Sequence, residues 1–280
     1  MDTLIQDIRY AARKLLRTPG FTVIAVATLA LAIGATTAVF SLVNGVLLKP
    51  LPYPQPEQLV RIGSTRTGAE ADAAPAFMSF LDFHDLRAGS TSIAQMAAIN
   101  TSTRNISGDG AEPLRLRAAR VSVNFFDVFA LPMQQGRGFS ANEAIDGADN
   151  VVVISDGLWR SYFGGDPRTV GRAVTLDGEP YTVVGIAPAG FDYPSERDIW
   201  TPLAPQSWEE DPGNRGAHYL QGMGRLKPGA AALAAKRELE TIAKGLEAQF
   251  PESNTNFGAT AEPLLEQMVG DVRPALYAML

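Results

Sequence analysis

Side chains that commonly perform catalysis are scarce in this sequence. Its two histidines, His84 and His218, lie far apart and lack the HExxH spacing of a zinc protease. His84 is flanked by Asp82 and Asp85, a pattern that suits a metal site or, more simply, the solvated polar face of a helix. His218 falls in an expected strand and is interpreted as a structural residue.

Motifs for nucleophiles and phosphates are incomplete. The motif of a hydrolase nucleophile elbow is broken at Ser155, because Val153 replaces its first glycine. The glycines of residues 165–172 have neither the spacing nor the Lys-Ser/Thr pair of a P-loop, and Gly222 and Gly224 lack the third glycine of a dinucleotide fingerprint. The sequence therefore predicts no catalytic, cofactor-binding or metal-binding residues, and no binding or hydrolysis of ATP by this chain.

The composition excludes further classes of protein. The 280 residues include no cysteine, which rules out disulfide scaffolds, cysteine-ligated zinc and thiol nucleophiles. A formal net charge of -6, from 24 basic and 30 acidic residues, argues against a nucleic-acid-binding protein. A basic stripe on an expected sheet is therefore interpreted as exposed partners of Asp and Glu; its members are Arg104, Arg115, Arg117 and Arg120.

A long apolar segment follows the N-terminal residues, and no residue from Thr18 to Leu48 is charged. A helix over residues 21–48 would be about 42 Å long, which exceeds the roughly 30 Å hydrocarbon core of a bilayer. The sequence therefore predicts a transmembrane helix over residues 21–48. Two other interpretations are a buried core helix, which is usually shorter, and a cleaved signal peptide, whose apolar stretch is about 7–15 residues long.

The charges beside this segment predict its orientation. Residues 1–17 contain four basic and two acidic residues, whereas the rest of the chain contains the other 20 basic and 28 acidic residues. By the positive-inside rule, the N-terminus is cytoplasmic and the main domain lies on the periplasmic side of a bacterial inner membrane. Residues 1–20 are predicted to be a cytoplasmic segment whose residues 3–17 form an amphipathic helix on the inner leaflet. A basic flank without defined structure is the alternative.

Beyond the apolar segment, residues 49–56 have proline at every second position, which predicts a stiff extended strut. Residues 57–272 are predicted to form an α+β domain of short units. Ser79 is expected to cap a helix that ends near Gly89. The expected strands cover 58–63, 93–101, 112–123, 151–155, 174–176, 181–186 and 218–226.

Two further signals concern turns and the longest helix of this domain. Asp177-Gly178 is the dipeptide that favours a type I′ hairpin turn. A long amphipathic helix is expected after Gly229 and should stop at Pro251. Together with the strands, these signals indicate a mixed α and β domain held by its hydrophobic core alone.

Five stretches, in the same order along the chain, resemble one family: the permease subunits of the macrolide-exporter and lipoprotein-releasing class of ABC transporters. The similarity is greatest to the duplicated orphan permeases of acidobacteria. Each motif alone is weakly specific, but the set of five covers essentially the whole chain. The stretches are Asp7–Phe21, Leu47–Pro54, Val121–Phe126 with Gly136–Phe139, Trp159–Phe191, and Arg225–Gly229.

The resemblance implies an architecture and a mechanism. Such permeases have one helix, a large periplasmic core domain and three more helices, and a separate ATPase docks on their cytoplasmic side. By analogy, porter-like βαβ halves are expected over 57–125 and 215–262, with an inserted β-rich subdomain over 126–214. ATP-driven closure of the ATPase is expected to move the periplasmic domain without covalent chemistry there, for export or extraction of a substrate.

The end of the sequence departs from the family pattern. Residues 273–280 resemble the start of a second membrane segment, so the chain is expected to be a fragment or the product of a truncated gene. The expected partners are an ABC ATPase, a second permease in a homo- or heterodimer, and the lipid bilayer, with no nucleic acid. The alternative function is a stand-alone, single-span periplasmic binding or adaptor protein, and an enzyme is the third possibility.

Overall fold

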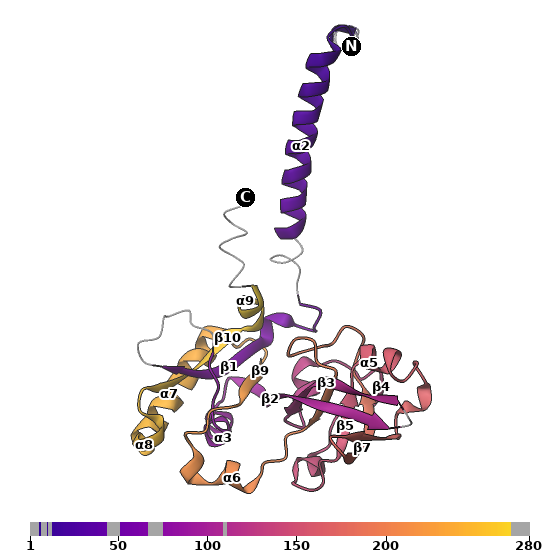
Figure 1. Cartoon of the computed structure of the whole chain (residues 1–280). Coiled ribbons are helices and arrows are strands. Elements are labelled where there is room, and N and C mark those ends of the chain that lie inside the picture. The colour runs from indigo at the N-terminus through magenta and orange to yellow at the C-terminus, as the bar shows by residue number, and fades with distance from the viewer. Residues whose placement is uncertain are drawn as a thin grey trace. The chain divides into compact units, whose positions relative to one another are not determined.

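The computed structural model describes Gln6, Tyr10 and residues 13–43, 51–66, 75–108 and 111–269 (Figure 1). The chain separates into two compact parts, residues 1–50 with 268–280, and residues 51–267. Residues 44–48 of the predicted membrane helix lie outside the described residues, as does the predicted second membrane segment at 273–280.

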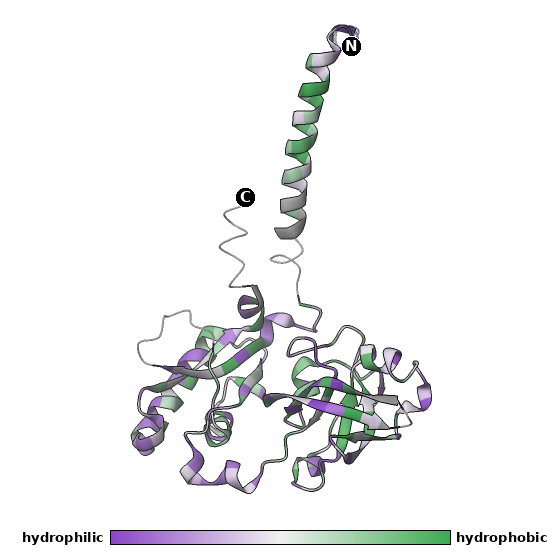
Figure 2. Cartoon of the chain, viewed as in Figure 1, coloured by the Kyte–Doolittle hydropathy of each residue, from purple (hydrophilic) through white to green (hydrophobic). Residues whose placement is uncertain are grey.

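In the first part, α2 (Pro19–Val43) is the apolar helix that the sequence predicts. It begins slightly before residue 21, because proline is well suited to the first turn, where its missing N–H would have no helical partner. The helical segment Pro19–Thr37 is long and apolar enough to cross a membrane (Figure 2), and none of it is buried within the structure. The hydroxyls of Thr28 and Thr36 donate to carbonyl oxygens four residues earlier, at 2.8 and 2.9 Å, so these polar groups are satisfied within the helix.

The predicted amphipathic helix before α2 is described only in part. Gln6, Tyr10 and the segment Arg13–Arg17 are helical and exposed, and Thr18 separates this segment from α2. The placement of residues 3–17 on a membrane surface stays a prediction.

The second part is built on a sheet whose first half contains β1 (Leu59–Arg66), β2 (Ile93–Gly108), β9 (Gln221–Leu226) and β10 (Phe257–Pro263). Their order is β10-β1-β9-β2, and every neighbouring pair is antiparallel. Therefore β1 and β2 are parallel and connect through α3 (Phe80–Gly89), while β9 and β10 are parallel and connect through α7 (Ala232–Gln249). These two interleaved βαβ units confirm the porter-like fold that the resemblance implies.

Helices α3 and α7 cover one face of this open sheet. The Ser79 hydroxyl caps α3 as predicted, because it accepts a hydrogen bond from the backbone N–H of Asp82 at 3.1 Å. Helix α7 begins and ends close to the predicted limits, and its apolar face packs on Val60 and Ile62 of β1. The buried positions of α7 recur every three or four residues, as helical periodicity requires: Ala235, Leu239, Ala243 and Leu246.

Two glycines of the central strand β9 allow this close packing. A Cβ atom at Gly222 would lie 2.9 Å from Cβ of Ile62 and 3.0 Å from Cε of Met78. A Cβ atom at Gly224 would lie 2.8 Å from Cδ1 of Ile62. The incomplete dinucleotide motif of the sequence is therefore explained by core packing.

The second half of the sheet is closed. β3 (Ala111–Val121) pairs with β2 and with β8 (Ile199–Pro202), and β8 pairs with β5 (Val151–Ile154). β5 pairs with β7 (Glu179–Ile186), β7 with β6 (Ala173–Leu176), and β6 returns to β2. The strands β2-β3-β8-β5-β7-β6 therefore form a closed ring, because the last strand, β6, pairs with the first, β2. This ring contains the β-rich subdomain that the resemblance implies, together with β3 and the second half of β2, which precede the predicted bounds of 126–214.

The predicted hairpin turn fastens the ring. Asp177 and Gly178 have φ angles of 49° and 90°, as a type I′ turn requires, and join β6 to β7. The Asp177 carboxylate accepts hydrogen bonds from both the backbone N and the side-chain Nδ2 of Asn105 at 2.9 Å. β2 extends to Gly108, beyond the predicted end at residue 101, because its second half pairs with β3 and β6.

The opposite face of the open sheet carries an aromatic core that also contacts the ring. It is centred on α4 (Phe125–Phe129), whose Phe126 lies 5.7 Å from the ring centroid of Trp200 on β8. Trp200 is fully buried, and its Nε1 donates to the backbone oxygen of Tyr193 at 2.9 Å. This core, which includes Leu59 and Met223 of the open sheet, joins the two halves of the domain.

The described part of the proline-rich segment is packed on this core. Gln55 has a left-handed φ of 50°, and η2 (Pro56–Gln58) is a 3-10 turn. The Tyr53 ring lies 4.9 Å from that of Phe129, and burial, with the nearby Asp192, raises the pKa of Tyr53 to about 12. The prediction of an extended strut over 49–56 is therefore wrong for its described residues, because burial of Tyr53 outweighs the extended preference of the prolines.

Short elements complete the second part and lie in its connections. They are β4 (Gln135–Gly136), η3 (Ala141–Ala144), α5 (Asp156–Ser161), η4 (Pro167–Thr169), α6 (Ser207–Glu210), η5 (Pro212–Asn214), α8 (Pro251–Asn254) and α9 (Leu264–Val269).

Candidate functional site

Ser155 caps a helix in the structure. Its Oγ accepts a hydrogen bond from the backbone N–H of Leu158 at 3.1 Å, and the residue is buried at the start of α5. This bond satisfies one of the free N–H groups in the first turn of the helix. The serine of the broken nucleophile motif therefore has a local structural role.

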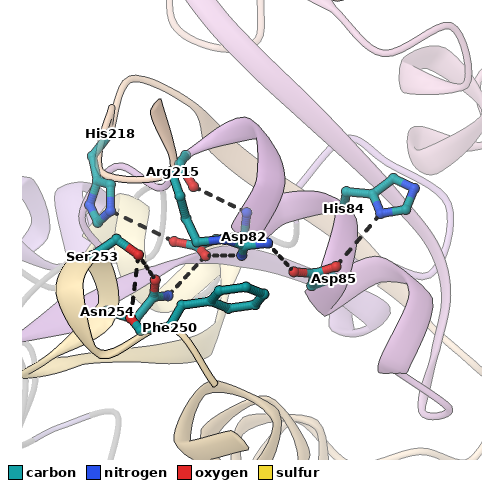
Figure 3. Close-up of polar contacts among 9 residues, drawn as sticks. Asp82, His84, Asp85, Arg215, His218, Phe250, Ser253 and Asn254 are labelled. Atoms are coloured by element: carbon teal, nitrogen blue, oxygen red, sulfur yellow. Dashed lines mark hydrogen bonds and ion pairs between the residues drawn. The ribbon is translucent and has the colours of Figure 1, made fainter. Parts of the chain in front are cut away.

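His84 and His218, remote in sequence, lie at opposite sides of one polar cluster (Figure 3). His84 is on the exposed side, with Nδ1 3.8 Å from Oδ1 of Asp85. His218 is on the buried side, with Nε2 3.7 Å from Oδ2 of Asp82. Asp82 and Asp85 come from α3, while His218 lies just before β9, so the cluster joins the two βαβ units.

Asp82 and Arg215 form the centre of the cluster. Arg215 Nη1 donates to Oδ1 of Asp82 at 2.9 Å, and its Nη2 lies 2.8 Å from Oδ2 of Asp85. Asn254 of α8 donates to the same Oδ1 of Asp82, also at 2.9 Å. The guanidinium carbon of Arg215 lies 3.9 Å from the centre of the Phe250 ring, which adds a cation–π contact. These contacts connect helices α3 and α8 with the chain segment that leads from the ring back to the open sheet.

Burial keeps the imidazole of His218 neutral. Desolvation lowers the pKa of His218, and this effect outweighs the attraction of Asp82, while the nearby Arg66 lowers the pKa further. Its Nε2 atom is buried without a hydrogen-bond partner among the described residues, and its ring packs 4.4 Å from that of Phe257. The imidazole is therefore packed as part of the cluster.

The cluster has no room for a substrate. The cavity beside Asp82 and Asn254 has a volume of about 10 Å³, which is no larger than one water molecule needs. Among the residues that the structure describes, no group of three His, Cys, Asp or Glu side chains is arranged to hold a metal ion. The geometry therefore suits a clamp between chain segments.

The basic stripe is paired with acidic residues, as the sequence predicts for three of its four members. Arg104 lies 3.4 Å from Asp177, and Arg117 pairs with Glu196. Arg120 lies 3.7 Å from the buried Glu209. Arg115 instead donates to the Thr103 hydroxyl at 3.3 Å. These contacts hold β2 and β3 against their neighbours within the domain.

The pair of Arg120 and Glu209 belongs to a second buried network. The Tyr219 hydroxyl donates to Oε1 of Glu209 at 2.6 Å. Burial raises the pKa of Tyr219, and the hydrogen bond to the Glu209 carboxylate raises it further. This network ties β3 of the ring to α6 and to the chain segment that precedes β9.

Comparison with known proteins assigns this chain to a family. Residues 22–242 match the family described as the MacB-like periplasmic core domain. The chain belongs to this family. Its relatives include the macrolide export ATP-binding/permease proteins MacB of Salmonella paratyphi A and Salmonella typhi, each 26% identical over 144 residues. The match covers 49% of this chain and 22% of each relative, so the chain spans less than a quarter of their length.

Solved structures share the fold of this MacB-like domain. The periplasmic region of MacB from Actinobacillus actinomycetemcomitans aligns with a TM-score of 0.55 and 13% identity, over 84% of this chain and 98% of that one. A permease domain from Porphyromonas gingivalis gives 0.54 and 14%, over 76% and 92%. The extracellular domain of the ABC-type transporter YknZ from Gram-positive bacteria gives 0.52 and 18%, over 72% and 99%.

The family assignment confirms the resemblance seen in the sequence. A MacB-like periplasmic core domain is part of an ABC transporter permease, and this chain combines it with a candidate N-terminal membrane helix. Sequence reasoning missed the cluster around Asp82 because its partners come from distant segments. The charged neighbours of His84, Asp82 and Asp85, were the available local signal.

Proposed function

We propose that this chain is the membrane-anchored N-terminal part of an ABC-type permease, and that its periplasmic domain transmits motion driven by a separate ATPase to an exported or extracted substrate. The family assignment supports the permease class. The observation that carries the mechanical role is the pairing of Val60 with Pro263, because the domain is entered and left on neighbouring strands. This arrangement suits a domain placed between two membrane segments, because it brings the two ends of the domain together.

In this proposal, the periplasmic domain consists of a part that moves and a second part that is attached to it. The porter-like part, 57–125 and 215–262, would receive motion from the membrane, and the insert at 126–214 would present the outer surface. β2 runs through both the open sheet and the ring, so a displacement at its start reaches the ring. We further propose that the permease acts as a dimer and has no catalytic residues of its own.

The membrane arrangement has a direct test, because the chain contains no cysteine. Single cysteines would be introduced as Arg17→Cys, before α2, and Leu114→Cys, an exposed residue of β3. A membrane-impermeant maleimide should label Leu114→Cys on bacterial cells with a permeabilised outer membrane, and should label Arg17→Cys only after lysis. The reverse pattern, or equal labelling of both variants before lysis, would contradict the proposed orientation.

The partner has a separate test. The chain, tagged and expressed from its own gene in its own bacterium, would be cross-linked and purified, and its partners identified by mass spectrometry. An ABC ATPase subunit and a second permease copy are expected. Recovery of periplasmic proteins without an ATPase would instead support the stand-alone binding or adaptor protein.

A further inference from the structure

A polar pocket lies at the start of β2, away from the clamp around Asp82. It has a volume of about 360 Å³. β3 ends at Val121, opposite Ile99, so residues 93–98 of β2 have a strand neighbour only on the β9 side. An extra residue between Ile93 and Gln95 shifts the register with β9 there, and such bulges redirect side chains. The pocket is lined by Arg87, Ser90, Ile93, Ala94, Gln95, Met96, Asn124 and Lys227.

Two residues that line this pocket each carry an acceptor without a donor. Oε1 of Gln95 and Oδ1 of Asn124 are buried atoms without a hydrogen-bond partner among the described residues. Asn124 is held in place by its amide, whose Nδ2 donates to the backbone oxygen of Met96 at 3.2 Å. Because buried polar atoms are nearly always hydrogen-bonded, two unsatisfied acceptors lining one pocket indicate a ligand that supplies donors.

Two cations line the same pocket. Arg87 and Lys227 are exposed, and neither has an ion-pair partner in the part of the chain that the structure describes. No carboxylate lines the pocket. The nearby Glu238 is already engaged, since the backbone N–H groups of Thr91 and Ser92 donate to it at 2.6 and 3.0 Å. The surroundings of the two cations therefore favour an anion.

We propose that this pocket binds a phosphodiester that carries a terminal N–H or O–H group, the chemistry of a phospholipid headgroup. The phosphate would lie between Arg87 and Lys227, and the terminal donor would reach the free oxygens of Gln95 and Asn124. A charge-assisted contact of a phosphate with Arg or Lys is stronger than a neutral hydrogen bond, so the cations supply affinity and the amides supply selectivity.

The position of the pocket favours a lipid as the source. Lys227 follows β9 directly, and the end of β9 pairs with Leu59, where the chain enters the domain. Only residues 44–50 separate the last residue of α2 from the domain. The lipid source thus rests on the proposed membrane attachment, whereas the chemistry of the pocket does not.

Soluble headgroups test the chemistry. The full chain in a maltoside detergent would be titrated by calorimetry with the methyl phosphodiester of ethanolamine, whose ammonium has three donors, and with the methyl phosphodiester of choline, whose quaternary ammonium has none. Neither compound has a hydroxyl group. The ethanolamine compound should bind at least about fivefold more tightly, the effect of hydrogen bonds to buried acceptors. Equal binding of the two compounds, or no binding of either, overturns the proposal without affecting the assignment as a permease.

Variants separate the two roles. Arg87→Ala with Lys227→Ala should weaken binding of both compounds at least about tenfold, because the charge-assisted contacts are lost. Gln95→Leu should instead remove most of the preference for the ethanolamine compound. Lys244→Ala, an exposed lysine of α7 that does not line the pocket, is the matched control and should bind as the unchanged chain does. A loss in the control equal to that in the double variant would contradict the site.

Nanodiscs distinguish a lipid from a free phosphodiester. If a lipid headgroup occupies the pocket, the soluble methyl phosphodiester of ethanolamine should bind more weakly to the chain in phosphatidylethanolamine nanodiscs than in phosphatidylcholine nanodiscs. Equal affinity in both nanodiscs would overturn the lipid source.

Discussion

The open sheet β10-β1-β9-β2 and the ring β2-β3-β8-β5-β7-β6 share one strand but are stabilised differently. The open sheet is assembled from distant parts of the chain, and its two βαβ units are tied by the buried clamp of Asp82, Arg215 and Asn254. The ring is closed by strand pairing, and its turn at Asp177 is fastened to β2. Both have strand ladders and hydrophobic cores, but the ring is also closed on itself by the pairing of β6 with β2, whereas the open sheet is also tied by side-chain contacts between distant segments.

This difference suggests where the domain can deform. Closed sheets have no edge from which to open, whereas an open sheet can separate at its helices or edge strands. Since β2 is common to both, the ring would move as one body with the start of that strand.

The strongest test of this comparison is Arg215→Ala. It leaves the Asp82 carboxylate buried without its cation, and breaking a buried pair typically costs about 3–5 kcal/mol. We expect urea unfolding to shift accordingly, and hydrogen exchange to show lost protection in α3, α7 and β10 while the ring keeps its own. The exposed Arg168→Ala, on the ring side, is the control and should leave the unfolding midpoint unchanged. Equal loss of protection in both halves would show that they unfold as one unit.

Gly222→Ala tests the packing of the open sheet alone. The added methyl group meets Ile62 and Met78, and overpacking of a core typically costs about 1–3 kcal/mol. Thermal unfolding should show this loss. Gly157→Ala in α5 is the matched control, because its Cβ would meet only the Ser155 hydroxyl at 3.8 Å. The idea fails if both variants have the same stability.

Gly178→Ala tests the closure of the ring. An alanine at a φ of 90° is strained, which costs about 1 kcal/mol. Exchange protection should fall first in β6 and β7, with the open sheet unaffected. Gly216→Ala is the control, because no heavy atom lies within 4 Å of its added Cβ. Loss of protection confined to α3 or α7 would contradict the separation of the two regions.

The smallest effect is a pH dependence of the open sheet. Burial alone would raise the pKa of Glu238, but hydrogen bonds from Ser92 and Thr91 hold it at about 2, compared with 4.5 for a free side chain. The unfolded chain therefore binds more protons between these values, so stability present above pH 4.5 is lost as the pH falls towards 2.

The comparison variant is Glu238→Gln. Urea titrations at several pH values would give the free energy of unfolding of each chain. Between pH 5 and 2, this free energy should change less for Glu238→Gln than for the unchanged chain. Glu240→Gln, exposed on the same helix, should retain the full pH dependence. Parallel curves for all three chains would exclude a role for Glu238.

Local signals made part of this structure predictable. The cap at Ser79 and the hairpin at Asp177-Gly178 depend on residues within three or four positions, so both appear where the sequence indicates. The apolar face of α7 and the apolar helix α2 were predictable for the same reason. Likewise, the family could be predicted, because five motifs recur in one order.

Contacts between distant residues were not predictable. Asp82 and Arg215 are separated by 133 positions, and neither is distinguished locally from a surface residue. The return of β6 to β2 closes the ring through Ile106 and Leu176, a pairing for which strand propensity carries no information. The proline spacing predicts a strut that includes Tyr53, because it carries information only about the conformation of the backbone. The ring of Tyr53 instead packs against Phe129.

The pairing of Val60 with Pro263 has a mechanical consequence. A force that pulls the two chain ends apart sideways would break the bonds between β1 and β10 one after another, starting at this pair, as a zipper opens. A force that slides one strand along the other would load all of these bonds at once, from Val60–Pro263 to Arg66–Phe257. The domain is therefore compliant to spreading of its two ends and stiff to their relative sliding.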